Sequence, residues 1–309
     1  MRSAIVIPTF NRAHHLGQAI EAALGQAQHD VLVVVVDDGS SDGSRAVASR
    51  WFDDPRFVYV ALGRNVGTAG AKNVGLALTP CDAISFHDSD DIPHRDKILR
   101  QQRILTRTDL GADPCLPWHL ASKQVPGGAA TIDLVLTAHR FVMADGSSAR
   151  IARTLSLLDD FFPNLQFGSG PLGDWVLINS GLFRRALFDR IGGFRDSVEE
   201  DRDLRNRALM AGANIWFIDD VLLDKYEQSD SLTAHAATGY RSDRREADRA
   251  AVWETIARWK AGGGWEAVPI NVPDVGFDFV SAPERLAVQD GLPMTEATRG
   301  WLTAALAAA

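Results

Sequence analysis

An unbroken aliphatic run followed by acids, VLVVVVDDGS at residues 31–40, is the feature that most constrains the fold. Apolar side chains on both faces are typical of a central strand in a parallel sheet, because helices cover both sides of such a sheet. A membrane-spanning helix needs roughly 20 apolar residues, so this run is too short to be one. We therefore expect a buried central strand that ends at Asp37 and Asp38.

The first hundred residues alternate between such apolar runs and segments with helical spacing. Strands are expected within residues 3–8, 30–40, 56–62 and 81–91, and helices within residues 11–27, 41–51, 67–78 and 94–107. Asn11 is available as the N-cap of the first helix. Strand–helix–strand repetition predicts an α/β domain with a mostly parallel sheet and helices on both faces.

The middle of the chain is less regular. Residues 131–151 predict two strands around an ADGS turn, or one long strand and a turn. Further on, the pattern predicts a strand and a helix ending at Gly192 and Gly193, a helix over 199–212 and a strand over 214–219. From about residue 240 a charged amphipathic helix and a glycine-rich joint at 262–264 follow. The last 45 or so residues show no pattern that assigns them to an element.

Polar residues gather where the expected parallel strands end. Pro8, Thr9, Asn11 and Arg12 follow the first strand, and two acidic segments, DDGSSDGS and HDSDD, follow the second and fourth. Ligands of open α/β sheets bind at the carboxyl ends of the strands. A bound ligand accounts for this polar edge better than a helix cap alone.

HDSDD at residues 87–91 places three carboxylates within four residues. Such carboxylates repel one another unless they are solvated, paired or bound to a cation. Mg²⁺ and Mn²⁺ prefer oxygen ligands, commonly one or two protein carboxylates plus substrate phosphates. We interpret the segment as a metal site, with a solvated acidic turn as the alternative.

Three further candidates have plain structural alternatives. Lys72, in the glycine-containing segment RNVGTAGAKNVG, could meet a pyrophosphate or be a surface lysine. The acids of EED at 199–201 could include a general base or could only favour the dipole of the helix that they begin. His235 could be a late ligand to metal or phosphate.

Composition excludes some classes of function. The formal net charge is −8, so electrostatics argue against a nucleic-acid partner. Two cysteines, Cys81 and Cys115, provide no disulfide framework and fit a reducing cytosol. The apolar stretch at the start is too short for a signal peptide. A cytoplasmic protein is the expectation.

The ordered set of motifs resembles the family 2 inverting glycosyltransferases, which have the nucleotide-sugar-binding GT-A fold. The matching segments are IPTFNR, VVVDDGSSDGS, NVGTAGAKNVGL, FHDSDD, LFRRALFDRIGGF and EEDRDLRNRALMAG. They cover roughly residues 3–235 in the order of the family. Where members often read DDWSHPDKI, this chain reads DDIPHRDKI.

The resemblance implies a role for each motif. Asp88 and Asp90 match the D-x-D motif of the family, with Asp90 the expected main ligand of Mn²⁺ or Mg²⁺ and Asp88 closer to the ribose; His235 stays a candidate metal ligand from its residue type alone. Asp201 is the expected general base with Glu200 supporting it, although the motif leaves open which of Glu200, Asp201 and Asp203 is the base. The residues expected to bind the nucleotide-sugar are Pro8, Thr9, Asn11, Arg12, Asp37, Asp38, Gly67, Lys72, Asn73, Asp88 and Ser89.

The implied reaction is transfer of a sugar, with inversion, from a nucleotide-diphosphate donor to a hydroxyl of a glycan, lipid-linked or small-molecule acceptor. A UDP-sugar and bacterial polysaccharide or glycoconjugate synthesis are favoured. Residues 1–107 would form the nucleotide-sugar-binding half, 108–238 the acceptor and catalytic-base half, and 239–309 a helical C-terminal extension. Peripheral association with the inner face of the membrane and a homodimer stay open.

Two alternatives to this reaction remain. One is a catalytically inactive module of the same fold that binds a nucleotide-sugar or a protein partner. The other is a nucleotidyltransferase, which normally has a glycine-rich, basic loop directly after the first strand. PTFNRAHHL occupies that place here and lacks the glycines.

Overall fold

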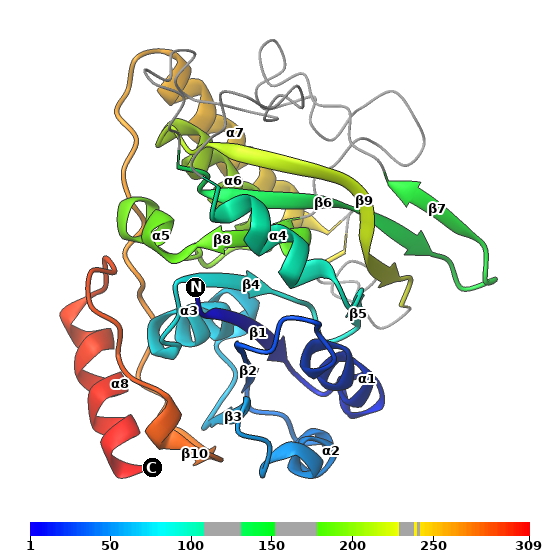
Figure 1. Ribbon diagram of the computed structural model, residues 1–309. Coiled ribbons are helices and arrows are strands. Elements are labelled where there is room, and N and C mark those ends of the chain that lie inside the picture. Colours follow the sequence, from blue (N-terminus) through cyan, green and yellow to red (C-terminus); the bar gives the residue numbers. More distant parts are fainter. Residues whose placement is uncertain (108–130, 152–177, 229–237, 240–241) are drawn as a thin grey trace.

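A computed structural model describes residues 1–107, 131–151, 178–228, 238–239 and 242–309 (Figure 1). In the first hundred residues the expected alternation is confirmed. The elements there are β1 (Ser3–Thr9), α1 (Ala13–Leu24), β2 (Val31–Asp37), α2 (Ser44–Ala48), a short 3-10 turn (Ser49–Trp51), β3 (Phe57–Leu62), α3 (Gly67–Leu78), β4 (Ala83–Phe86), β5 (Asp91–Pro93) and α4 (Lys97–Leu105).

The middle of the chain adds β6 (Leu134–Val142), β7 (Ser148–Ile151), a 3-10 turn (Ile178–Ser180), β8 (Leu182–Arg184), α5 (Arg185–Ile191), α6 (Glu200–Met210) and β9 (Ile215–Tyr226). The C-terminal part contains α7 (Asp243–Lys260), β10 (Phe277–Val280), a 3-10 turn (Pro283–Arg285) and α8 (Glu296–Ala308). The predicted hairpin at 131–151 is therefore confirmed as β6 and β7, and the predicted helix at 199–212 as α6.

The described strands form one ten-stranded sheet with the order β10-β3-β2-β1-β4-β8-β6-β9-β5, and β7 pairs with β6. The segment β3-β2-β1-β4 is parallel, as predicted from the apolar runs. Beyond β4 the sheet is mixed, because β8 pairs antiparallel with both β4 and β6 while β6 and β9 are parallel. The α/β fold class is confirmed, and the continuous parallel segment β3-β2-β1-β4 comes from the first hundred residues.

Side chains that alternate along the central strands divide the core between the two faces of the sheet. Ala4 and Val6 of β1 pack in a cluster with residues of α3, α5, α6 and α8. Ile5 and Ile7 of the same strand pack in a second cluster with residues of α1 and α4. Because every residue of β1 and β2 is buried, these strands hold the polar residues that follow them on a rigid edge.

The C-terminal part is more than a helical extension. Strand β10 pairs antiparallel with β3 and forms an edge of the sheet, beside α8 (Figure 1). Trp301 of α8 donates a hydrogen bond from Nε1 to the carbonyl of Val272 at 2.9 Å and packs edge-on against Phe277. The charged helix α7 lies at the other end of the molecule, next to α6 (Figure 1).

One local prediction is wrong. Asn11 is not the N-cap of α1, because the cap residue is Arg12 and its side chain makes no capping bond. Asn11 has a left-handed backbone with φ of 52°. Its amide accepts a hydrogen bond from Ser41 N, and its own N–H donates to Ser40 Oγ, both at 2.8 Å. Asn11 therefore ties the end of β1 to the loop after β2.

Candidate active site

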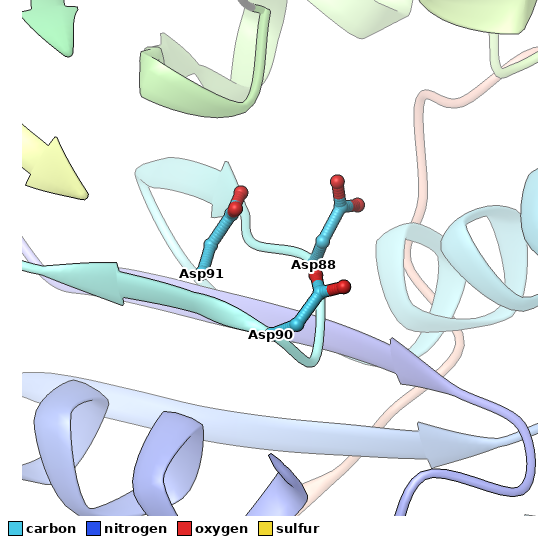
Figure 2. Close-up of side chains that lie close together, drawn as sticks. All are labelled: Asp88, Asp90 and Asp91. Carbon is cyan, nitrogen blue, oxygen red and sulfur yellow. The ribbon is translucent and has the colours of Figure 1, made fainter. Parts of the chain in front are cut away.

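The acidic segment after β4 forms a compact cluster of Asp88, Asp90 and Asp91 (Figure 2). One carboxylate oxygen from each residue lies within 4.8 Å of those of the other two. Asp91 is the first residue of β5 and is fully buried, whereas Asp88 and Asp90 are partly exposed in the preceding turn. The turn is positioned by His87, whose N–H donates to the carbonyl of Val6 in β1 at 3.0 Å.

Two residues that the sequence pattern did not reveal hold this cluster. Asn179 donates from Nδ2 to Asp88 Oδ2 at 2.8 Å. Lys225 Nζ lies 3.2 Å from Asp88 Oδ2 and 3.4 Å from Asp91 Oδ1. Neither was predictable from spacing, since Asn179 lies in the short 3-10 turn Ile178–Ser180 and the position of Lys225 depends on the register of β5 against β9.

Burial and mutual repulsion shift the pKa values of the three carboxyls in different directions. Burial raises the pKa of Asp91 to about 7, although Lys225 lowers it. Burial and Asp88 raise the pKa of Asp90, with Lys225 and Arg12 opposing them. Burial also acts on Asp88, but Lys225, Lys72 and hydrogen bonds outweigh it and bring its pKa below the ordinary value.

The donor set of this cluster fits a hard divalent cation. It offers three carboxylates, the ligand type that Mg²⁺ and Mn²⁺ prefer. Oδ2 of Asp91 is buried without a hydrogen-bond partner among the described residues, so it retains a lone pair for a ligand. The cluster adds Asp91 to the residues expected from the sequence. His235 lies outside the described residues.

The acids that end β2 are held by protein groups on the same edge of the sheet. Asp37 accepts hydrogen bonds from the hydroxyl of Tyr59 and from Ser40 N. Asp38 accepts from Val66 N at 2.6 Å and from Gly67 N at 2.9 Å. Burial raises the pKa of Asp38 to about 7 against the effect of these two amides. Asp38 thus fastens the start of α3, where Gly67 has φ of +82°, to the end of β2.

Residues at the end of β1 and just after it lie at the same edge. Thr9 is buried, and its Oγ1 has no hydrogen-bond partner among the described residues. Arg12 lies near enough to Asp90 to lower the pKa of that carboxyl. Pro8 is buried inside β1 in register with Val36, and Ser89 is buried in the acidic turn.

A buried ion pair joins α3 to the start of α6. Lys72 Nζ lies 3.0 Å from Glu200 Oε1, and the lysine side chain is only 2% exposed. Burial lowers the pKa of Lys72, but Glu200, Asp88 and Asp201 together raise it above its ordinary value. Lys72 is therefore paired with Glu200 and lies near enough to Asp88 and Asp201 to be affected by their charges. Lys72 is not the exposed surface lysine of the alternative interpretation.

The side chain of Asn73 forms hydrogen bonds with the backbone of Phe194. Its Nδ2 donates to the carbonyl of Phe194, and its Oδ1 accepts from Phe194 N, both at 2.8 Å. These bonds fix the loop between α5 and α6, so the structure does not bring the Asn73 amide to the polar edge.

The acids around the start of α6 differ in their partners. Glu199 forms ion pairs with Arg202, Arg245 and Arg249, which connect α6 to α7. Asp203 pairs with Arg207 at 2.8 Å and Arg195 at 3.2 Å. Asp201 is partly exposed and forms none of the ion pairs found among the described residues. Among these acids, Asp201 is the one that no ion pair in the described part of the chain engages, and it accepts a hydrogen bond from Arg202 N at 2.7 Å.

The Glycosyl transferase family 2 sequence model matches residues 4–120 of this chain. A succinoglycan biosynthesis protein, ExoO of Rhizobium meliloti, is 38% identical over 104 residues, which are 34% of this chain and 29% of that protein. An uncharacterized glycosyltransferase of Nostoc, alr2836, is 32% identical over 111 residues, 36% of this chain and 34% of its own length. The aligned part is thus about a third of each of these relatives.

Solved structures resemble the fold over most of the chain. TarS 1-349 of S. aureus, solved with UDP, has a TM-score of 0.55 at 17% identity, covering 84% of this chain and 72% of that one. The mannosyltransferase PcManGT of Pyrobaculum calidifontis, solved with GDP-Man and Mn²⁺, has a TM-score of 0.55 at 19% identity, covering 87% and 66%. The fold is GT-A, and residues 4–120, which begin in β1, have the sequence pattern of glycosyltransferase family 2.

Proposed function

We propose that this chain transfers a sugar from a nucleotide-diphosphate donor to an acceptor hydroxyl with inversion. The observation that carries the proposal is the convergence of the Asp88–Asp90–Asp91 cluster, Lys72 and Asp201 at the carboxyl edge of the parallel strands. Ligands of α/β sheets bind at that edge. Relatives named for succinoglycan biosynthesis or for glycosyl transfer support the class of reaction.

The donor is proposed to lie across the ends of β1, β2 and β4. Thr9, Arg12 and Asp37 would contact the base and ribose, with Asp88 closer to the ribose. Asp90, Asp88 and Asp91 would hold a Mn²⁺ or Mg²⁺ ion, which offsets the charge of a diphosphate when bound. Neighbours of the same fold are solved with UDP or with GDP-Man and Mn²⁺, so both nucleotide classes are candidates and a UDP-sugar is tested first.

Asp201 is the proposed general base. It would accept the proton of the acceptor hydroxyl while the oxygen attacks the anomeric carbon and the nucleoside diphosphate departs from the opposite side. Lys72 lies among Asp88, Glu200 and Asp201 and would orient Glu200 while adding positive charge near the departing group. A single displacement of this kind inverts the anomeric configuration.

The same proposal assigns different roles to two parts of the chain. Residues 1–107 would bind the donor, and residues 108–238 would supply the base and bind a glycan, lipid-linked or small-molecule acceptor. Among the described residues no helix combines the length and apolarity needed to cross a membrane.

The test is release of the nucleoside diphosphate from UDP-glucose, UDP-GlcNAc and GDP-mannose, with and without simple sugar acceptors. The wild-type protein should turn over one donor, and Asp201→Asn and Asp90→Ala should each abolish turnover. A folded wild-type protein that binds a nucleotide-sugar but never releases the diphosphate would instead indicate an inactive binding module.

A further inference from the structure

Lys225 lies inside the acidic cluster rather than beside it. In the antiparallel pair of β5 and β9 it stands directly opposite Asp91. Its ammonium contacts both Asp91 and Asp88, at 3.4 and 3.2 Å, and its side chain is 20% exposed. A cation contributed by the chain itself therefore already neutralises two of the three carboxylates proposed to hold a metal ion.

Asp224, the residue next to Lys225 in β9, has different partners from Lys225. Asp224 is paired with Arg140 and His94, and these contacts involve none of the three clustered acids. Asp224 therefore links β9 to its neighbours by ion pairs that do not need Lys225. Alternation along the strand directs Lys225 to the acidic cluster and Asp224 away from it.

Lys225 holds two of the three clustered carboxylates at contact distance. Asp90, by contrast, forms none of the ion pairs found among the described residues. The cluster therefore offers one carboxylate without an ion pair and two that are held by a lysine.

We propose that Lys225 is an internal counter-cation that a divalent metal ion must displace from Asp88 and Asp91. This inference rests on the proposed function, because it concerns the metal site of that reaction. An ion would meet Asp90 first and would gain the other two carboxylates only as the lysine side chain moves out. Lys225 thereby weakens metal binding and keeps the acidic cluster neutralised when no ion is present.

The first experiment uses the wild-type protein. Lysines are reductively methylated with and without saturating Mn²⁺, and the rate at each lysine is read by mass spectrometry. Lys225 should react several-fold faster with Mn²⁺ because its side chain, only 20% exposed in the cluster, moves out into solvent. The amino group of Met1, an exposed residue at the opposite end of β1 from the cluster, serves as the internal standard. An unchanged rate at Lys225 in the Mn²⁺-bound protein would overturn the proposal.

The second experiment compares Mn²⁺ affinities by calorimetry. Lys225→Met should bind Mn²⁺ at least about tenfold more tightly than wild type, since a competing charge is removed at contact distance. Arg140→Met is the matched control: it removes a positive charge from the paired strand β6, and its partner is Asp224. Its Mn²⁺ affinity should be unchanged. Equal or weaker binding by folded Lys225→Met would contradict the proposal.

Failure of this inference and failure of the proposed function have different readouts. If wild type and Lys225→Met bind Mn²⁺ equally while nucleotide binding needs Mn²⁺, only the role of Lys225 is wrong. If neither protein binds Mn²⁺, the inference is overturned, and nucleotide binding by the wild type then decides the transferase proposal. Should Lys225→Met fail to fold, the methylation experiment still tests the displacement.

Discussion

The ammonium of Lys72 lies 3.0 Å from the carboxylate of Glu200, and this pair joins the middle of α3 to the first turn of α6. The pair occupies Glu200, while two arginines occupy Asp203. Asp201 lies between these two acids in sequence and has neither kind of partner among the described ion pairs. This difference in partners is the structural reason for assigning proton transfer to Asp201.

Asp201→Asn should lower kcat by about 10²–10⁴-fold, the usual contribution of a general base, without weakening nucleotide binding. Asn preserves the size of the side chain but cannot accept the proton. Asp196→Asn is the control, because Asp196 is an exposed acid in the loop before α6. Turnover by Asp201→Asn at the wild-type rate would mean that another residue is the general base, and Glu200→Gln would then be tested.

Breaking the buried pair from either side should destabilise the protein. Glu200→Gln leaves the Lys72 charge buried, and removal of one partner of a buried pair typically costs about 3–5 kcal/mol. Lys72→Met leaves the carboxylate of Glu200 without its partner and should cost a similar free energy of unfolding. The double variant should lose less stability than the sum of the two single variants, as measured by urea unfolding. Additive losses would mean that the two charges do not interact.

The glycine that follows α5 should tolerate no side chain. Gly192 has φ of +74°, and a Cβ there would lie 1.9 Å from the carbonyl oxygen of Val268. Gly192→Ala should therefore lower the free energy of unfolding by about 2 kcal/mol or more. Gly264→Ala is the matched control, since a Cβ at that position meets nothing within 4 Å. Equal stabilities of the two variants would refute the close contact between Gly192 and Val268.

Lys97 should make stability rise with pH above neutrality. Burial lowers its pKa to about 7 although Asp91 raises it, whereas the ordinary value is 10.5. Between these values the unfolded chain binds more protons at Lys97 than the folded protein does, so the unfolding free energy increases with pH. The slope from this one group is at most about 1.4 kcal/mol per pH unit.

The measurement is urea unfolding of wild type and Lys97→Met from pH 7 to pH 10. Groups shared by both proteins cancel in the difference, and burial keeps the pKa of the contacting His87 well below this range. Wild type should gain stability relative to the variant as the pH rises. A difference that does not change with pH would contradict the lowered pKa of Lys97.

The elements of the first hundred residues could be predicted because their periodicity is local. Buried strands such as β2 are apolar throughout, and α3 shows its apolar face at helical spacing. Strand β10 could not be predicted in this way. Its residues gain their partners from β3, more than 200 positions earlier, and no periodic pattern marks them.

Only those residues of the candidate site that have a telling side chain and follow a predicted strand could be predicted from the sequence. Asp88 and Asp90 follow an apolar strand and were identified from that position. Lys225 was missed because its role depends on cross-strand register with Asp91, and Asn179 because it belongs to a short irregular turn. Asn73 has a suitable side chain for ligand binding, but nothing in the sequence predicts its hydrogen bond to the backbone of Phe194.

Calorimetry with UDP, GDP and dTDP, each with and without Mn²⁺, tests whether the acidic edge of the sheet is a metal-dependent donor site. We expect that one nucleotide binds tightly, that it does so only with Mn²⁺, and that Asp90→Ala abolishes the metal-dependent part of this binding. Asp219→Asn, an exposed acid paired with Arg150, should behave like wild type. If well-folded wild-type protein binds none of the three nucleotides, with or without Mn²⁺, the acidic edge is not a donor site and the transferase proposal is wrong.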